Sequence, residues 1–391
     1  MLRASLLCVL ALLAGGCARR APPPAPPPPP NYSAALPEGR AALVEVDPAT
    51  LPPLRLSPEE RSALQAGIRH SLAFLERASS AERFPRELPI DRALVQRTLR
   101  DLAALLATAS DEELERALRT RYRAFASVGW DGSGTVLFSG YYTPILAASW
   151  TRDERYRYPV YKRPPQLVGG GVHEQAQWRR ADGTLVPCPP YQELEASGAL
   201  AGLELLWFAD PWEAYTVRVQ GSAKVRLRDG QVIDIGYAGT TGHPYVAIGP
   251  LLVAEGKLPA EQLTAEGLRQ YFRAHPDELP RYAARNPRGV FFTVTSGGPY
   301  GSLGQPVTAE VTIATDKQLF PPAAPVLVQT TAIAADGRAV PYVGLRLDQD
   351  TGGAMRAPGR ADLYYGVGDA AGLRAGRQWH EGRMWYLVLR P

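Results

Sequence analysis

The spacing of apolar residues changes near Thr135 from a helical to a strand-like pattern, and this change constrains the fold more than any other feature. Before it, apolar residues recur at helical spacing, and the predicted helices cover residues 57–78, 91–107 and 110–122. The first of them opens with Ser-Pro-Glu-Glu, which is a helix-start signal. The 37 prolines and 37 glycines favour many turns over long helical bundles. We therefore expect a mainly β protein with several helices near its N-terminus.

Strand patterns follow the change of period. They run from residue 135 to about 250 and return after a helical interlude at about 259–286. Apolar and polar residues alternate at 215–219, which predicts a strand, and residues 228–231, Arg-Asp-Gly-Gln, predict the turn of a hairpin. The β-rich body is therefore expected to extend to the end of the chain.

The first residues have the pattern of a secretion signal. Residues 1–16 hold a basic Arg3, an apolar run too short to span a bilayer and small residues before Cys17. This arrangement resembles the bacterial lipoprotein signal, which implies cleavage before Cys17 and lipidation of its thiol. The alternative is simple cleavage and release. Because Ala18 rather than Asp follows the cysteine, the resemblance favours the outer membrane, with the protein facing the periplasm.

The proline-rich segment after Cys17 is expected to act as a tether. Residues 21–30 are almost all proline and should form an extended polyproline spacer within a tether of residues 17–53. The ordered body is expected to begin near Leu54.

Charge and cysteine content exclude several classes of function. The formal charge of +4 falls by one when the signal with Arg3 is removed, so no nucleic-acid partner is implied. Cys188 has no partner for an intramolecular disulfide once Cys8 is removed and Cys17 is blocked. The five histidines are scattered singly, so we expect no metal site and no cofactor.

The candidate chemistry lies between residues 349 and 372, where three aspartates stand among glycines. If residues 360–366 form a strand, Asp362 shares one face with Tyr364, and an acid among apolar and aromatic neighbours retains its proton as a general acid requires. Asp369 is expected to cap a helix. For Asp350 the residues leave two alternatives, support of Asp362 or a turn in which it bonds the amides of residues 352 and 353.

Several blocks of sequence carry a family resemblance. In order and approximate spacing they resemble the membrane-bound lytic transglycosylase A family of bacterial murein enzymes, from about residue 54 to the end. The blocks are GYYTP (140–144), VQGS (219–222), GYAGTTGHPYVAIG (236–249), NPRGVFF (286–292) and QDTGGAM-x6-D-x3-G-x-G-x3-G (349–372).

The resemblance implies a two-domain β protein. A double-psi β-barrel would be built from residues 54–144 and 287–391, an inserted β domain from residues 145–286 would bind glycan, and a groove would separate them. The implied activity is cleavage of the β-1,4 bond between N-acetylmuramic acid and N-acetylglucosamine in peptidoglycan. No water is added, and a 1,6-anhydromuramoyl end is left.

The resemblance also implies the site residues. Asp362 matches the catalytic aspartate, which would serve as both acid and base because the sugar's own C6 hydroxyl replaces water as nucleophile. Asp350 matches the aspartate before the TGGA turn and would orient or tune Asp362. The expected glycan contacts are Tyr142, Thr143, Gln220, Gly221, Ser222, Tyr237 and His243.

Some residues depart from the family pattern. Ala223 stands where a glycine is usual, Thr241 replaces an asparagine, and an arginine is missing near Val311. The alternatives are a peptidoglycan-binding lipoprotein without turnover and a hydrolytic muramidase that uses a second carboxylate. The expected partners are glycan strands and, through Cys17, the membrane; the sequence identifies no partner among wall-synthesis proteins.

Overall fold

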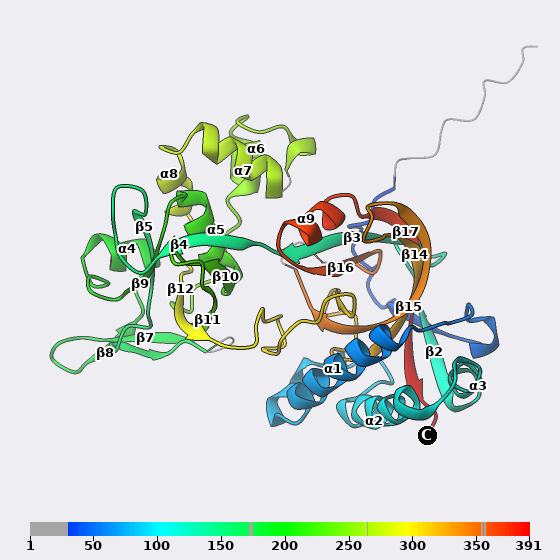
Figure 1. Ribbon diagram of the computed structural model, residues 1–391. Helices are drawn as coiled ribbons and strands as arrows, with labels where there is room; N and C mark the ends of the chain where they lie inside the picture. Colours follow the sequence, from blue (N-terminus) through cyan, green and yellow to red (C-terminus); the bar gives the residue numbers. More distant parts are fainter. Residues whose placement is uncertain (1–29, 172–174, 264, 353–354, 356) are drawn as a thin grey trace, which may run out of the picture. The chain divides into compact units, whose positions relative to one another are not determined.

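A computed structural model describes residues 30–391 apart from 172–174, 264, 353–354 and 356 (Figure 1). The signal, Cys17 and nearly all of the proline-rich segment lie outside the described residues, so the expectations about them stay predictions.

Six strands close into a barrel. The hydrogen-bonded order is β17-β14-β15-β13-β16-β3, and β3 pairs back onto β17. The pairs β3–β16 and β13–β15 are parallel, and the other pairs are antiparallel. The strands are β3 (Val136–Thr143), β13 (Thr312–Ala314), β14 (Pro325–Ile333), β15 (Ala339–Asp350), β16 (Arg360–Val367) and β17 (Trp379–Leu389). This closed barrel confirms the expected fold class.

The barrel sheet is extended beyond β17 by two further strands. β2 (Tyr122–Ser127) pairs with the C-terminal half of β17, and β1 (Leu43–Val46) pairs with β2. The long strand β17 pairs with two strands along one edge, because its first residues pair with β3 and its last residues pair with β2.

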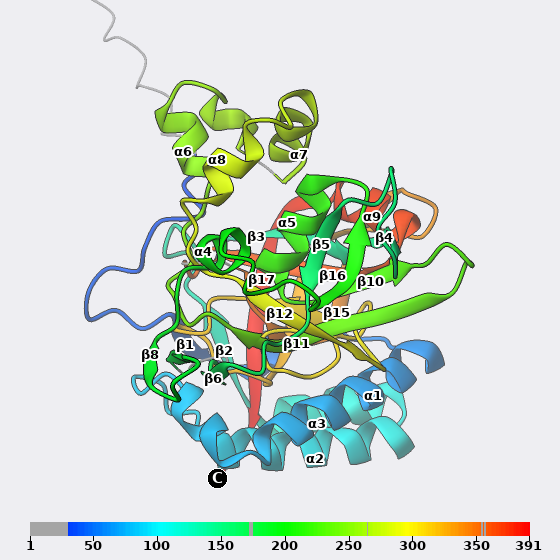
Figure 2. The ribbon, with the colours of Figure 1, turned by 90° about the vertical axis from the view of Figure 1, so that its left-hand side faces the viewer.

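The three expected N-terminal helices are present and lie together against one side of the barrel (Figures 1 and 2). They are α1 (Pro58–Leu75), α2 (Arg92–Thr108) and α3 (Asp111–Arg121). Ser57 and Glu60 form a reciprocal capping box at the start of α1, in which the serine oxygen accepts from the Glu60 amide at 3.2 Å and the glutamate accepts from the Ser57 amide at 2.8 Å. Local sequence therefore determines where α1 begins.

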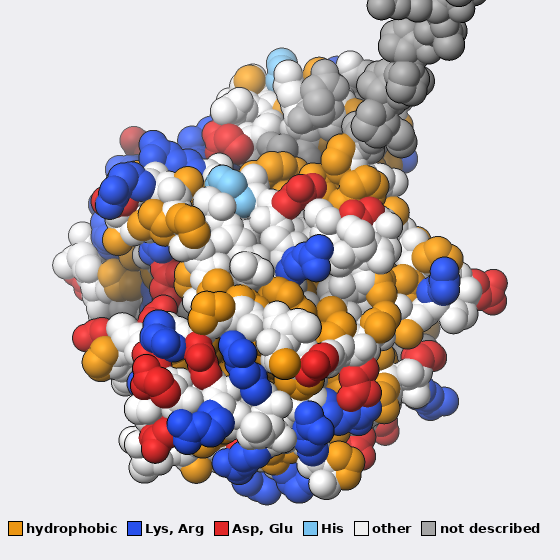
Figure 3. Space-filling view, turned by 90° about the vertical axis from the view of Figure 1, so that its right-hand side faces the viewer, with side chains coloured by type: hydrophobic (Ala, Val, Ile, Leu, Met, Phe, Trp, Pro, Cys, Tyr) orange, Lys and Arg blue, Asp and Glu red, His pale blue; other side chains and the backbone are white. Residues whose placement is uncertain are grey.

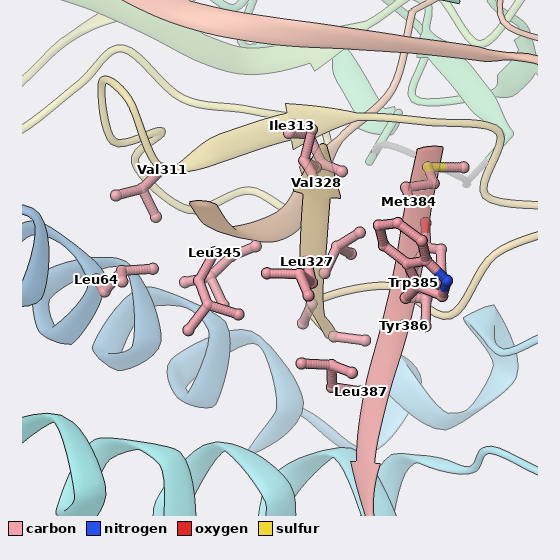
Figure 4. Packing of buried hydrophobic residues seen from close by; sticks show 14 of the residues in the cluster. Leu64, Val311, Ile313, Leu327, Val328, Leu345, Met384, Trp385, Tyr386 and Leu387 are labelled. Atoms are coloured by element: carbon pink, nitrogen blue, oxygen red, sulfur yellow. The ribbon is translucent and has the colours of Figure 1, made fainter. Parts of the chain in front are cut away.

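One apolar cluster joins these helices to the barrel. Leu64 of α1 and Leu345 of β15 are both buried and lie on facing elements (Figure 4). Burial of a side chain of this size stabilises the folded state by about 1.5–3 kcal/mol relative to leaving it exposed. Packing of this kind holds the helices onto strands that come much later in the chain.

A second sheet holds the inserted part of the chain. Its order is β12-β11-β10-β4-β9-β5, and a small sheet, β6-β7-β8, accompanies it. The strands are β4 (Ile145–Ser149), β5 (Tyr158–Tyr161), β6 (Leu167–Gly169), β7 (Ala176–Arg179), β8 (Leu185–Pro187), β9 (Glu204–Phe208), β10 (Ala223–Arg226), β11 (Val232–Thr240) and β12 (Val290–Thr295). Since β12 pairs with β11, we propose that the insert ends at Thr295 rather than at residue 286.

A helical group accompanies the second sheet. Helices α6 (Gly249–Ala254), α7 (Ala265–Ala274) and α8 (Leu279–Ala283) lie together in Figure 2 and share a buried aromatic cluster with α5 (Pro211–Gln220). The rings of Trp212 and Phe272 stack at 5.1 Å between centroids. Among the described residues, the other α-helices are α4 (Tyr191–Ala196) and α9 (Asp369–Ala375).

The strand predicted at residues 215–219 is wrong, because these residues belong to α5. Asp210 caps this helix by accepting from the Trp212 amide at 2.8 Å, and Pro211 occupies its first position. Gly221 ends it with a φ of 80°. Asp210 followed by Pro211 is a helix-start signal in the sequence, and five residues are too few for alternation to distinguish a strand from a helix.

The hairpin predicted at residues 228–231 is confirmed as the connection between β10 and β11. Asp229 accepts from the Gln231 amide at 2.9 Å, and Gly230 has a φ of 87°. These are the local bonds and the backbone conformation that the turn residues indicated.

Candidate active site

The pairing of β16 with β3 positions the candidate acid. In this parallel pair Asp362 lies opposite Ser139, and Tyr364 lies opposite Tyr141. Ala361, Leu363 and Tyr365, which alternate with them, are buried in the barrel core. The Asp362 side chain is 22% exposed, so its carboxylate is reachable from outside the barrel. The strand and its two faces are as the alternation predicted.

The contacts of the Asp362 carboxylate are polar. The Ser139 hydroxyl donates to Asp362 Oδ1, and Arg360 Nη2 lies 3.7 Å from the same oxygen. Arg360 Nη2 also donates to Ser139 Oγ at 3.0 Å. Both neighbours are polar, whereas the sequence suggested apolar and aromatic surroundings. Arg360 and Ser139 are thus site residues that sequence reasoning missed, although Arg360 has the same strand parity as Asp362.

Asp350 ends strand β15 and is held by three donors. Its carboxylate accepts from the amides of Ser302 and Thr351, each at 2.8 Å, and from the Tyr141 hydroxyl at 3.0 Å. Of the amides expected in a turn, that of Gly353 lies outside the described residues. Burial raises the pKa of Asp350, while the three hydrogen bonds act in the opposite direction. Asp350 is therefore anchored separately from Asp362.

Tyr141 connects the surroundings of the two acids. Its ring centroid lies 4.9 Å from that of Tyr364, and its hydroxyl donates to Asp350. Burial raises the pKa of Tyr141 well above its ordinary value, and the charges of Asp350 and Asp362 both contribute. Sequence reasoning chose Tyr142 instead, although neighbouring strand residues point to opposite faces.

The structure places Tyr142 and Thr143 on different sides of β3. A Cβ added to Gly372 of α9 would lie 2.8 Å from the Tyr142 ring, so Tyr142 packs against that helix. Thr143 Oγ1 lies 2.9 Å from the Tyr364 hydroxyl and shares the face of Asp362. Of these two predicted glycan contacts, the structure brings only Thr143 to the face of the acids.

The third aspartate, Asp369, is not the helix cap that was predicted. Gly368 is the N-cap of α9 and makes no side-chain cap bond, and Asp369 is the first residue inside the helix. An acid there still interacts favourably with the positive end of the helix dipole.

The predicted contacts in the insert gather at the end of α5. A Cβ added to Gly221 would lie 3.8 Å from the Tyr237 ring, and Gln220 and Ser222 flank this glycine. The Tyr237 hydroxyl donates to the Gly170 carbonyl at 2.7 Å. His243 lies elsewhere, with its Nε2 2.8 Å from the Cys188 carbonyl oxygen, which gives this ring a structural contact inside the insert.

Together with burial, the charge of Asp234, a member of an ion pair in the insert, raises the pKa of Tyr364 in the barrel. Lys224 and Asp234 lie opposite each other in the β10–β11 hairpin and pair at 2.7 Å. Burial, together with the charges of Asp350 and Asp234, raises the pKa of Tyr364 to about 12. The hairpin register places Lys224 opposite Asp234, whereas the effect of Asp234 on Tyr364 depends on the tertiary structure.

A cavity of about 710 Å³ borders the loop at residues 302–304, in which the Ser302 amide donates to Asp350. Ser302 lines this cavity together with Arg77, Arg83 and Lys317. Within the described residues, no three His, Cys, Asp or Glu side chains are grouped in a way that could hold a metal ion.

Two family models match the chain. The model described as the MltA specific insert domain matches residues 137–293, and the model of the 3D domain matches residues 311–388. The first match ends inside β12, which agrees with the pairing of that strand in the second sheet.

Named relatives match most of the chain. Membrane-bound lytic murein transglycosylase A of Escherichia coli (strain K12) is 31% identical over 274 residues, which are 68% of this chain and 70% of that protein. The protein of the same name from Vibrio cholerae is 31% identical over 268 residues, 67% of each chain.

Solved structures share the fold. The membrane-bound lytic murein transglycosylase from Agrobacterium tumefaciens has a TM-score of 0.70 and 27% identity, and the match covers 89% of this chain and 98% of that one. E. coli MltA with bound chitohexaose has a TM-score of 0.62 and 23% identity, with 92% and 97% covered.

Proposed function

Because the chain belongs to the membrane-bound lytic murein transglycosylase A family, we propose that it cleaves the β-1,4 bond between N-acetylmuramic acid and N-acetylglucosamine and leaves 1,6-anhydromuramoyl ends. Family membership rests on the relatives that are 31% identical over two thirds of the chain. The chain is accordingly an enzyme, a peptidoglycan lytic transglycosylase. The bound chitohexaose of the E. coli structure supports a glycan as its ligand.

The position of Asp362 carries the proposed mechanism. Its carboxylate is partly exposed on the outside of the barrel and is held by Ser139 and Arg360. In the first step, protonated Asp362 donates to the glycosidic oxygen while the bond from that oxygen to C1 breaks. In the second, the Asp362 carboxylate takes the proton of the C6 hydroxyl as its oxygen bonds to C1. The proton returns to Asp362, so one residue serves both steps.

The polar contacts of Asp362 hold its carboxylate in place for both steps. The Ser139 hydroxyl donates to Oδ1, and the Arg360 guanidinium lies near the same oxygen. The C6 hydroxyl belongs to the substrate itself, so proximity replaces the encounter with a water molecule.

Asp350 is a poor candidate for the second carboxylate of a hydrolase. Three of the roughly four acceptor positions of its carboxylate are occupied, by Ser302, Thr351 and Tyr141, which leaves little room to bind and activate a water molecule. We propose that Asp350 supports Asp362 through Tyr141. The Tyr141 hydroxyl donates to Asp350, and burial and the charges of both acids raise the pKa of this tyrosine.

The site of action follows from the N-terminal signal and the relatives. The relatives are named membrane-bound. Within the described part of the chain, none of the helices has the length and apolar character needed to cross a membrane. We propose that a lipid on Cys17 anchors the protein to the outer membrane and that the enzyme faces the periplasm.

The test is product analysis on purified murein sacculi with the detergent-solubilised full chain. Anhydro ends, one water lighter than reducing ends by mass spectrometry, are expected. Reducing ends would identify a muramidase, and binding without release would identify a binding protein.

The assignment of Asp362 is tested by Asp362→Asn, which should bind sacculi and lose turnover by about 10²-fold or more, because the amide cannot transfer the proton. The matched control is Asp369→Asn, which changes an exposed acid of α9 and should keep wild-type turnover. Wild-type turnover in Asp362→Asn refutes its role.

A further inference from the structure

Trp379, the first residue of β17, lies exposed in the same row of side chains as Asp362. The residue is 61% exposed. It lies opposite Ser139 in the β17–β3 pair, and Ser139 lies opposite Asp362 in the β3–β16 pair. Residues directly opposite each other share a face of the sheet. Two strand spacings separate the backbones of Trp379 and Asp362, which is about 10 Å.

Arg360 fixes the orientation of the Trp379 ring. The guanidinium carbon lies 5.4 Å from the ring centroid, and the same guanidinium contacts Ser139 Oγ and lies near Asp362 Oδ1. One face of the indole is therefore covered by the group that also positions the carboxylate. The high exposure of Trp379 leaves its other face open to solvent.

An isolated exposed aromatic residue needs no functional explanation. Trp379 differs because it is held by a cation–π contact and shares a row with the candidate acid. A flat, rigid aromatic surface suits a ligand with an apolar face and a polar rim. A pyranose ring has this character, since its C–H bonds lie on its faces and its hydroxyl groups around its edge.

We propose, on the basis of the proposed function, that Trp379 is a platform for a sugar ring of the glycan strand, near the bond that Asp362 cleaves. The open face of the indole stacks on the C–H face of the ring, and the rim hydroxyls remain free for other partners. The platform fixes the position of the strand along the row Trp379–Ser139–Asp362, and thereby which linkage meets the acid. Arg360 gives the platform positive charge, which favours a neutral or anionic saccharide over a cationic ligand.

The test compares Trp379→Ala and Trp379→Phe with a matched control, Trp150→Ala. Trp150 is 48% exposed and follows β4 in the second sheet, away from the row. With the full chain in detergent and soluble, uncross-linked glycan strands, Trp379→Ala should raise KM about tenfold while kcat changes less than about twofold. Trp379→Phe, which keeps an aromatic surface, should retain most of the affinity, and Trp150→Ala should match wild type.

Two kinetic outcomes would overturn the platform. An unchanged KM in Trp379→Ala excludes stacking, and a fall in kcat at constant KM means that the ring only holds Arg360. Absence of cleavage by the wild-type chain would instead contradict the proposed function. Calorimetry with the same strands distinguishes failure of the platform from failure of the proposed function. If the double variant Asp362→Asn/Trp379→Ala binds the strands more weakly than Asp362→Asn alone, the platform is supported even without turnover. Unchanged binding there refutes it.

Discussion

At the residue scale, the site separates two carboxylates by their surroundings. Asp362 contacts a hydroxyl and a guanidinium, whereas the partly buried Asp350 accepts from two backbone amides and a tyrosine hydroxyl. Burial raises the pKa of Asp350, and the hydrogen bond from Tyr141 lowers it. Two acids in different environments can take different roles in one reaction.

Replacing Tyr141 by Phe should shift the pH dependence of the enzyme. The substitution removes a donor to the Asp350 carboxylate, so the pKa of Asp350 should rise further and its ionised form should appear only at higher pH. If ionised Asp350 supports Asp362, the acid limb of the kcat/KM profile moves to higher pH. Tyr142→Phe is the control, because that ring packs against α9. An acid limb that stays in place in Tyr141→Phe would exclude the supporting role of Asp350.

At the element scale, the close contact of α9 with β3 supports the strand that carries Ser139, Tyr141 and Thr143. Gly140 lies in this contact, where a Cβ would come 2.7 Å from the Ala375 backbone and 2.9 Å from Gln378 Cβ. Only a residue without a side chain allows the helix to lie this close. The glycine of the GYYTP block is thus explained by packing.

Gly140→Ala should destabilise the protein by about 1–3 kcal/mol, because backbone atoms must move to admit the methyl group. Its melting temperature and its turnover should both fall, since β3 also carries site residues. Gly376→Ala is the matched control at the end of α9, where an added Cβ would lie 3.4 Å from its nearest neighbour, the Gly372 carbonyl oxygen, and φ is −66°. A melting temperature for Gly140→Ala equal to that of Gly376→Ala would contradict this account.

At the scale of the whole molecule, the barrel is assembled from segments far apart in the chain. β3 comes before the insert, whereas its neighbours β16 and β17 come after it. On the face seen in Figure 3, basic and acidic side chains are interspersed, without a patch of a single sign. The proposed lipid on Cys17 would hold the enzyme near the cell wall.

Cys17→Ser should release the protein from the membrane fraction without changing its chemistry. The substitution removes the thiol that would carry the lipid, and the site residues lie in a body that starts after the tether. Cell fractionation measures the first effect, and turnover on soluble glycan strands measures the second. Cys188→Ser is the control for loss of a thiol in the body. Retention of Cys17→Ser in the membrane fraction would refute the anchor.

Features set by neighbouring residues could be predicted from the sequence. The capping boxes started α1 and α3 where Ser57 and Ser110 indicated, and alternation placed Asp362 and Tyr364 on one strand face. These features depend on bonds and periods within a few residues, which the sequence contains directly.

Only the tertiary structure decided which side chains meet at the site. Ser139 and Arg360 are 221 residues apart in sequence, and Tyr141 and Asp350 are 209 apart. Their contacts depend on the register of β3 against β16 and on the burial around Asp350, and both result from packing of the whole barrel. For the same reason Tyr141 rather than Tyr142 faces the acids, and the row from Asp362 to Trp379 appears only when β17 closes the barrel against β3.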